Sequence, residues 1–263
     1  MSKRFDGNSA KRTIPAEPGP TEGDIRTPDL HELQSRFERA ARAAGATGPG
    51  EDLFRELVAR YHEPHRHYHT LAHIDACLVW LDWFSGSAEH AEEVELALWF
   101  HDAVYALGGE DNELRSAELV RARLGALGVS TAVLERIAAC VESTARHIAS
   151  GPDAALVVDL DLSILGAGPR DFERFEAQIR REYAHVPEPV FRAARCGVLE
   201  QFLRRPVLYT TPAIRAELET RARDSLTRRI AELSGGHTAA RTSSELPLRV
   251  EQPRPSGTMR GTW

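Results

Sequence analysis

Apolar residues recur every three or four positions through most of the chain, and this spacing predicts one helix after another. Polar caps, glycines and prolines separate the periodic stretches, and proline opens three of the later ones, as is common at helix starts. We therefore expect an all-α bundle of about eight or nine helices. The expected helices begin near residues 29, 51, 70, 91, 111, 130, 169, 189 and 212.

Two details of this pattern bear on the chemistry. The fourth helix is expected to run to about Leu107, because the apolar run stops at Gly108 and Gly109. The sixth is expected to carry Thr144 and His147 on its apolar stripe, so that both side chains point inward.

One segment, LVVDLDLSI, fits either a strand or a helix. Its residues alternate as a half-buried strand would, yet Val157, Asp161 and Leu165 also share a helical face. No partner strand is evident, so a helix is preferred. Asp161 then faces inward, and Asp159 lies behind it or faces solvent.

Both ends lack a helical or strand period and hold too few apolar residues to offset the entropy of ordering. We predict disordered tails over residues 1–28 and 235–263, and one domain over residues 29–234. The net charge of −6 argues against a dedicated nucleic-acid binder. No apolar run suits a signal peptide or a membrane span, and the three cysteines include no CxxC pair, so a cytoplasmic protein without membrane association is expected.

Histidines and carboxylates stand out against this background. The segment HEPHRHYHTLAH holds five histidines, among them His69 and His73, four residues apart. His101 and Asp102 follow a dense apolar run, and a buried ionised Asp requires a cation or full hydrogen bonding. Mixed imidazole and carboxylate ligands suit Mn, Fe, Zn, Mg or Co. Structural alternatives stay open: a solvated histidine loop, a salt-bridged Asp102 and a core His147.

The order His, His-Asp, distant Asp resembles the HD superfamily of metal-dependent phosphohydrolases. The chain more closely resembles a family of predicted bacterial HD phosphohydrolases. Six sequence blocks occur in the same order as in that family and cover roughly residues 30–233: YHTLAHI, ALWFHDAVY, DNELRSAELV, STARH, DLDLSILG and IRREY. YHTLAHID is also similar to the first motif of class I cyclic-nucleotide phosphodiesterases, although Thr70 replaces an Asn and their substrate-clamping glutamine is not recognisable.

The resemblance implies a bundle of the HD type that hydrolyses a phosphomonoester or phosphodiester, of a nucleotide or another small phosphorylated metabolite, with one or two divalent ions. It implies His69 and Asp102 as catalytic residues, with His69 as proton donor. The implied metal ligands are His73, His101, Asp102 and Asp161.

Around these ligands we expect residues that bind substrate or orient the ligands: Thr144, His147, Glu113, Arg180 and Glu182. Arginine should grip the phosphate, and Arg180 is favoured over Arg66, Arg146 and Arg195. Three alternatives remain: a di-iron oxygenase of the HD type, a non-catalytic metal-binding HD module, and a phosphatase of the haloacid-dehalogenase type, in which LVVDLDLSI would be a strand.

Overall fold

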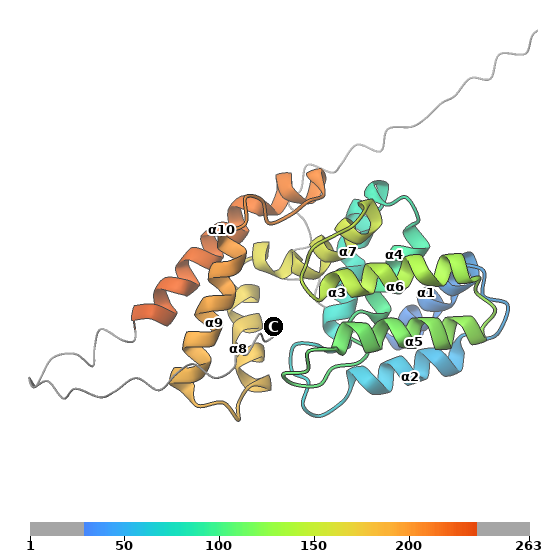
Figure 1. Ribbon diagram of the computed structural model, residues 1–263, viewed down its shortest axis with the longest axis horizontal. Coiled ribbons are helices and arrows are strands. Elements are labelled where there is room, and N and C mark those ends of the chain that lie inside the picture. Colours follow the sequence, from blue (N-terminus) through green and yellow to red (C-terminus); the bar gives the residue numbers. More distant parts are fainter. Residues whose placement is uncertain (1–28, 236–263) are drawn as a thin grey trace, which may run out of the picture.

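The computed structural model describes residues 29–235, which contain ten α-helices, two short 3₁₀ helices and no strand (Figure 1). The expectation of an all-α domain is confirmed. The predicted disordered tails lie outside the described residues, except that Gly235 ends the last helix. The elements are α1 (Leu30–Ala43), α2 (Glu51–Tyr61), α3 (Leu71–Phe84), η1 (Ser85–Ser87), α4 (Ala91–Phe100), α5 (Asn112–Ala126), α6 (Thr131–Thr144), α7 (Pro152–Asp161), η2 (Leu162–Gly166), α8 (Pro169–Glu182), α9 (Glu188–Leu203) and α10 (Pro212–Gly235).

The ambiguous segment is helical, as preferred. It forms α7 and the tight turn η2, so the strand that a haloacid-dehalogenase reading needs is not there. The expected position of Asp159 is wrong, because this side chain is fully buried. Its two carboxylate oxygens accept hydrogen bonds from the backbone N–H groups of Thr210 and Thr211, which fixes the start of α10 against α7.

The fourth helix is shorter than the sequence predicts. α4 ends at Phe100, and His101 and Asp102 occupy the turn that follows. Side chains from elsewhere satisfy the backbone of this turn: Arg66 donates to the carbonyls of Asp102 and Ala103, and Ser116 accepts the N–H of Val104. The segment is still buried after the helix ends, so its apolar pattern continues and conceals the helix end.

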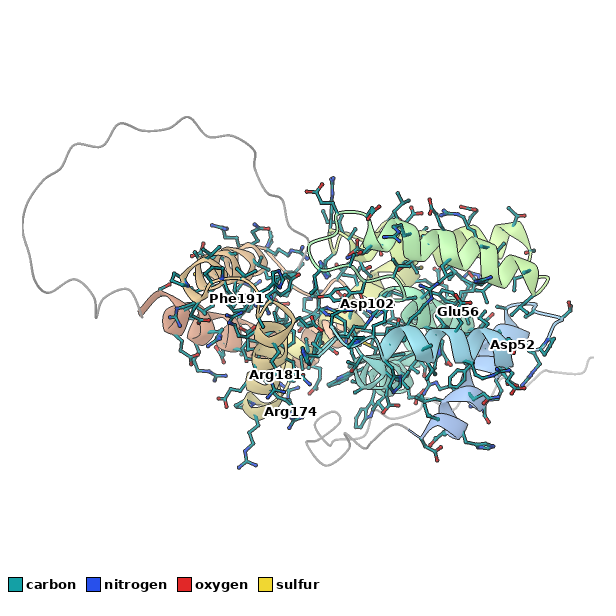
Figure 2. All side chains as sticks on the ribbon, turned by 90° about the horizontal axis from the view of Figure 1, so that it is seen from below. Asp52, Glu56, Asp102, Arg174, Arg181 and Phe191 are labelled. Atoms are coloured by element: carbon teal, nitrogen blue, oxygen red, sulfur yellow. The ribbon has the colours of Figure 1, made fainter. Side chains whose placement is uncertain are left out.

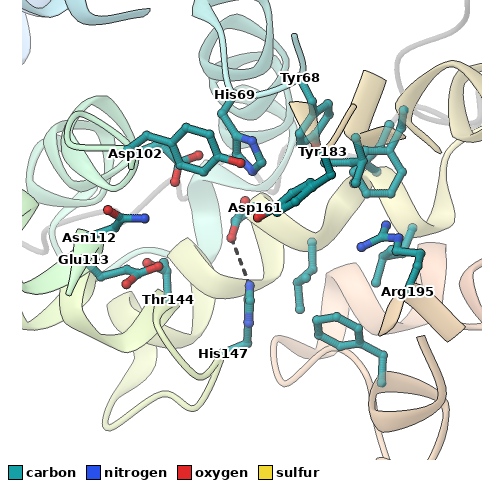
Figure 3. Close-up of a pocket in the computed structure, with 17 residues that line it drawn as sticks. Tyr68, His69, Asp102, Asn112, Glu113, Thr144, His147, Asp161, Tyr183 and Arg195 are labelled. Carbon is teal, nitrogen blue, oxygen red and sulfur yellow. Dashed lines mark ion pairs between the residues drawn. The ribbon is translucent and has the colours of Figure 1, made fainter. Parts of the chain in front are cut away.

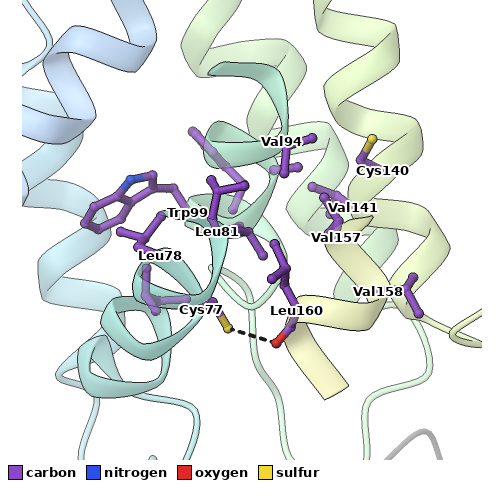
Figure 4. Packing of buried hydrophobic residues seen from close by; sticks show 14 of the residues in the cluster. Cys77, Leu78, Leu81, Val94, Trp99, Cys140, Val141, Val157, Val158 and Leu160 are labelled. Carbon is purple, nitrogen blue, oxygen red and sulfur yellow. Dashed lines mark hydrogen bonds between the residues drawn. The ribbon is translucent and has the colours of Figure 1, made fainter. Parts of the chain in front are cut away.

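α4 lies at the centre of the core, because it is apolar on nearly all sides beyond its glutamate-rich start and α1, α3, α6 and α7 pack around it. Figure 4 shows Val94 and Trp99 of this helix beside Leu81 of α3 and Val141 of α6. The ring of Trp99 meets Phe37 and Phe54 edge-on, at centroid separations of 5.6 and 5.8 Å. This core holds the ends of α3, α4 and α7, where the candidate ligands lie.

Helices α8–α10 form a second group beside α1–α7 (Figure 1). α10 packs on α9 and on η2. At the η2 contact, a Cβ on Gly166 would lie 2.8 Å from Leu218 Cβ, so only glycine permits this approach. Asp102 lies near the junction of the two groups (Figure 2). None of the helices in residues 29–235 combines the length and the apolar character that crossing a membrane requires.

Candidate metal centre and active site

Four side chains converge where α3, α4 and α7 meet. His73 comes from the first turn of α3, His101 and Asp102 follow α4, and Asp161 is the last residue of α7. Both imidazoles are almost fully buried. We call these four residues the four-residue centre, and they are the ligands that the resemblance implied.

The distances within the centre suit a shared cation. His73 Nε2 lies 3.2 Å from both His101 Nε2 and Asp161 Oδ1, and 3.7 Å from Asp102 Oδ2. His101 Nε2 lies 3.1 Å from Asp102 Oδ2 and 3.5 Å from Asp161 Oδ1. Ligands at 2.0–2.2 Å from one ion, in octahedral or tetrahedral arrangement, are about 2.8–3.6 Å apart. His73, His101 and Asp161 can therefore hold a metal ion together. Asp102 Oδ2 lies beside this group, within 4 Å of both imidazole Nε2 atoms.

The protonation of the centre is consistent with this reading. His101 Nδ1 lies 2.9 Å from the carbonyl of Leu98 and donates to it, which leaves Nε2 facing the other ligands. Burial raises the pKa values of Asp102 and Asp161, but the imidazoles, His101 foremost, more than offset this effect and hold both below the usual range. Two ionised carboxylates in such a site need cationic charge beside them, which either protonated imidazoles or a bound cation supplies.

His69 stands at the edge of the centre, at the entry to α3, where the sequence placed it. α3 begins at Leu71 and Thr70 caps it, so His69 belongs to the preceding turn. Its ring still lies 6.2 Å from that of His73, centroid to centroid. Burial lowers the pKa of His69, but Asp102 and Glu182 more than offset this and raise it.

Glu182, the last residue of α8, orients His69. Its Oε1 accepts the backbone N–H groups of residues 67, 68 and 69 at 2.7–3.0 Å. Its Oε2 lies 2.7 Å from His69 Nδ1 and accepts the Tyr105 hydroxyl at 2.8 Å. Burial raises the pKa of Glu182, but the hydrogen bond from His69 and those from the backbone lower it to about 2. Glu182 thus stays ionised and fixes Nδ1 of His69 as a donor, so that Nε2 is free to face the pocket.

Asp102 and Asp161 of the four-residue centre line a pocket whose walls come from both groups of helices. Figure 3 shows His69, Asp102 and Asp161 beside Glu113, Thr144 and His147, with Tyr183 and Arg195 on the other side. Glu113 Oε2 is buried without a hydrogen-bond partner among residues 29–235. Burial, and then the nearby Asp102, raise its pKa. Thr144 Oγ1 donates to the carbonyl of Val141, so it shapes the wall.

His147 reaches the pocket from a position that the sequence did not predict. α6 ends at Thr144, and His147 adopts a left-handed conformation with φ +50°. Its N–H donates to Thr144 and that of Ile148 donates to Ser143, a helix end that glycine usually occupies. The side chain points inward as expected, with Nε2 at 3.3 Å from Asp161 Oδ2.

Two arginines proposed as phosphate grips have other roles. Arg180 pairs with Glu188 and donates to the carbonyls of Tyr183 and Val186, so it closes the turn after α8. Arg66 is buried and donates to three carbonyls on both sides of the site. Arg195 is the arginine that lines the pocket. Tyr105 and Tyr183 were missed, since neither stands in a pattern that distinguishes it from a core aromatic residue.

Comparisons of the chain with protein-family models, with characterised proteins and with solved structures found no match. The function of the protein has therefore to be inferred from the arrangement of its own residues.

Proposed function

We propose that this protein hydrolyses a phosphate ester with the help of a divalent metal ion, and that the ester is a small phosphorylated metabolite or nucleotide. One observation carries the proposal: both carboxylates of the four-residue centre line the same pocket as the oriented His69, and Asp161 can share a metal ion with His73 and His101. A metal site alone would fit many functions. A metal site beside a proton donor that a buried carboxylate aligns is typical of a hydrolase.

A divalent ion held by the four-residue centre would offset charge on the phosphoryl oxygens and lower the pKa of a nearby water. The protein groups complete the reaction. The oxygen of a water attacks phosphorus in line with the ester oxygen, and the P–O bond to that oxygen breaks. His69 gives the proton on Nε2 to the departing alkoxide. Glu113, with a carboxylate oxygen that has no partner among residues 29–235, takes the proton that the water loses.

The sharpest experiment compares His69 with a neighbour in the same histidine-rich segment. His69→Ala should retain the metal and lose about 10²–10⁴ in turnover of alkyl phosphates. The loss should be much smaller with p-nitrophenyl phosphate, because p-nitrophenolate leaves without a proton. His67→Ala is the control, since His67 is exposed. Equal losses on both substrates, with the metal retained, would remove His69 from acid catalysis.

Metal analysis of the purified protein tests the rest. A divalent ion at one or two equivalents, lost in His73→Ala, supports the proposal. A coloured iron protein that consumes dioxygen would favour an oxygenase of the HD type instead. Metal binding without turnover of any phosphate ester would favour a non-catalytic module.

A further inference from the structure

Arg195 of α9 is a buried cation in the wall of the pocket, and the proposed reaction does not use it. The residue is only 3% exposed. Its guanidinium lies over the ring of Phe175, with 5.1 Å from Cζ to the ring centroid. Its two hydrogen bonds within residues 29–235 both go to one oxygen of Glu176, from Nε at 3.1 Å and from Nη2 at 2.6 Å. These contacts hold the guanidinium rigidly and leave Nη1 out of the ion pair.

Glu176 does not belong to Arg195 alone. Its second oxygen accepts Nε of Arg229 at 2.9 Å. Burial raises the pKa of Glu176, but Arg195 and then Arg229 more than offset this and keep the carboxylate ionised. Two guanidiniums thus share one carboxylate, and Nη1 of Arg195 takes no part in the ion pair.

The pocket has opposite charges at its two ends. Asp102 and Glu113 line one side, and Figure 3 shows Arg195 on the side farthest from them, beyond Tyr183. Apolar side chains such as Leu165, Ile179 and Phe202 line the pocket as well. If the reacting phosphate of the substrate binds at the four-residue centre, Arg195 is therefore available to bind a different part of the substrate.

We propose that Arg195 binds a second anionic group of the substrate, so that the substrate is a small phosphate ester whose leaving group carries a carboxylate or another phosphate. A planar guanidinium that is already held in place recognises either group through charge-assisted hydrogen bonds. The assignment of the reacting end rests on the proposed function, but the anion site itself does not. Arg195 is then a specificity residue that leaves the bond-breaking step unchanged.

The test uses matched esters and the full chain with Mn²⁺. Ethyl, propyl and butyl phosphate are compared with the ω-carboxyalkyl phosphates and the α,ω-bisphosphates of the same chain lengths. We expect kcat/KM to be about 10- to 100-fold higher for a series with a second anionic group (the two-anion esters) at its best length, the range of one charge-assisted hydrogen bond. The series with the larger gain shows whether the second group is a carboxylate or a phosphate.

Two variants and a control locate the effect. Arg195→Gln should bring the ratio of kcat/KM between two-anion and plain esters to about one, with kcat/KM for the alkyl phosphates within a few-fold of wild type. Arg195→Lys keeps the positive charge that pairs with Glu176 and so preserves the fold, but it removes the planar guanidinium. The ratio of kcat/KM between the two kinds of ester should therefore fall in this variant too. Arg192→Gln removes a cation from the same helix outside the pocket, and the ratio should stay unchanged.

A ratio near one in the wild type, with alkyl phosphates hydrolysed, would overturn the anion site and leave the proposed function intact. If no ester is hydrolysed, the proposed function fails, and calorimetric titration of the same compounds decides the anion site separately. Tighter binding of the two-anion esters that Arg195→Lys abolishes would support it. Equal affinities for the plain and two-anion esters would overturn it.

Discussion

Residue 147 provides a test that separates backbone strain from the role of the side chain. His147 holds the left-handed position that ends α6, with φ +50°. A side chain with a Cβ costs about 1–2 kcal/mol in this conformation, and glycine avoids that cost. The two backbone hydrogen bonds of the helix end, both 3.2 Å long, do not involve the imidazole, so either substitution can keep them.

His147→Gly and His147→Ala form a matched pair. Both remove the imidazole and its contact with Asp161, so that loss cancels between them. Only alanine retains the strained Cβ. After subtraction of the greater freedom of glycine in the unfolded chain, the glycine variant should be more stable by about 1 kcal/mol. For a domain of this size, that difference corresponds to about 2–4 °C in Tm.

Urea and thermal unfolding of the two variants measure this difference, and Ala139→Gly provides the control. Ala139 is exposed within α6, where glycine should cost about 1 kcal/mol. Relative to alanine, glycine should therefore raise the free energy of unfolding at residue 147 and lower it at residue 139. A glycine variant at 147 that is no more stable than the alanine variant would refute the argument from backbone strain. Both variants at 147 should lose turnover, since neither carries the imidazole that faces Asp161.

Three further predictions follow from other contacts. Asp102→Ala should lose most of its bound metal by elemental analysis, and metal content equal to wild type would contradict its place among the ligands. Glu182→Gln should keep the metal but slow turnover of alkyl phosphates more than that of p-nitrophenyl phosphate, because Glu182 orients His69; equal slowing would assign it a structural role only. Because arginines hold the pKa of Glu176 below its ordinary 4.5 in the folded state, its ionisation stabilises the fold above that pH, and the stabilisation is lost as the pH falls. The difference in unfolding free energy between wild type and Glu176→Gln should therefore narrow in acid, and a constant difference would show that the ion pair contributes nothing.

The sequence was sufficient for the fold class and for most helix starts, because amphipathic periods and prolines are local signals. Helix ends were harder to predict. Asp102 and His147 both lie beyond a helix that the apolar pattern extended too far, since buried turns carry apolar residues just as helices do. The direction of their side chains was still right, because burial and not helical register determines which way they face.

The partners of polar side chains could not be predicted from the sequence. Arg180 was favoured as the phosphate-binding arginine because it lies in the IRREY block. Its guanidinium instead donates to backbone carbonyls of the turn that follows its own helix. Arg195 stood in no motif, and its place in the pocket depends on how α9 packs beside α8. Asp159 had a spacing that suggested solvent, but the loop that it binds lies about 50 positions further along the chain.

Arg66 and Glu182 hold the backbone of the site together. Arg66 ties the carbonyl of His69 to those of Asp102 and Ala103, and Glu182 ties the backbone around His69 to the end of α8. Both are buried charges with several hydrogen bonds, and removing either would leave buried polar groups without partners. His69 is therefore fixed from two sides, relative to Asp102 by one charge and relative to α8 by the other. The proton-donor role proposed for His69 requires a position within hydrogen-bond reach of the leaving oxygen, and Arg66 and Glu182 fix the residue in one place as that role demands.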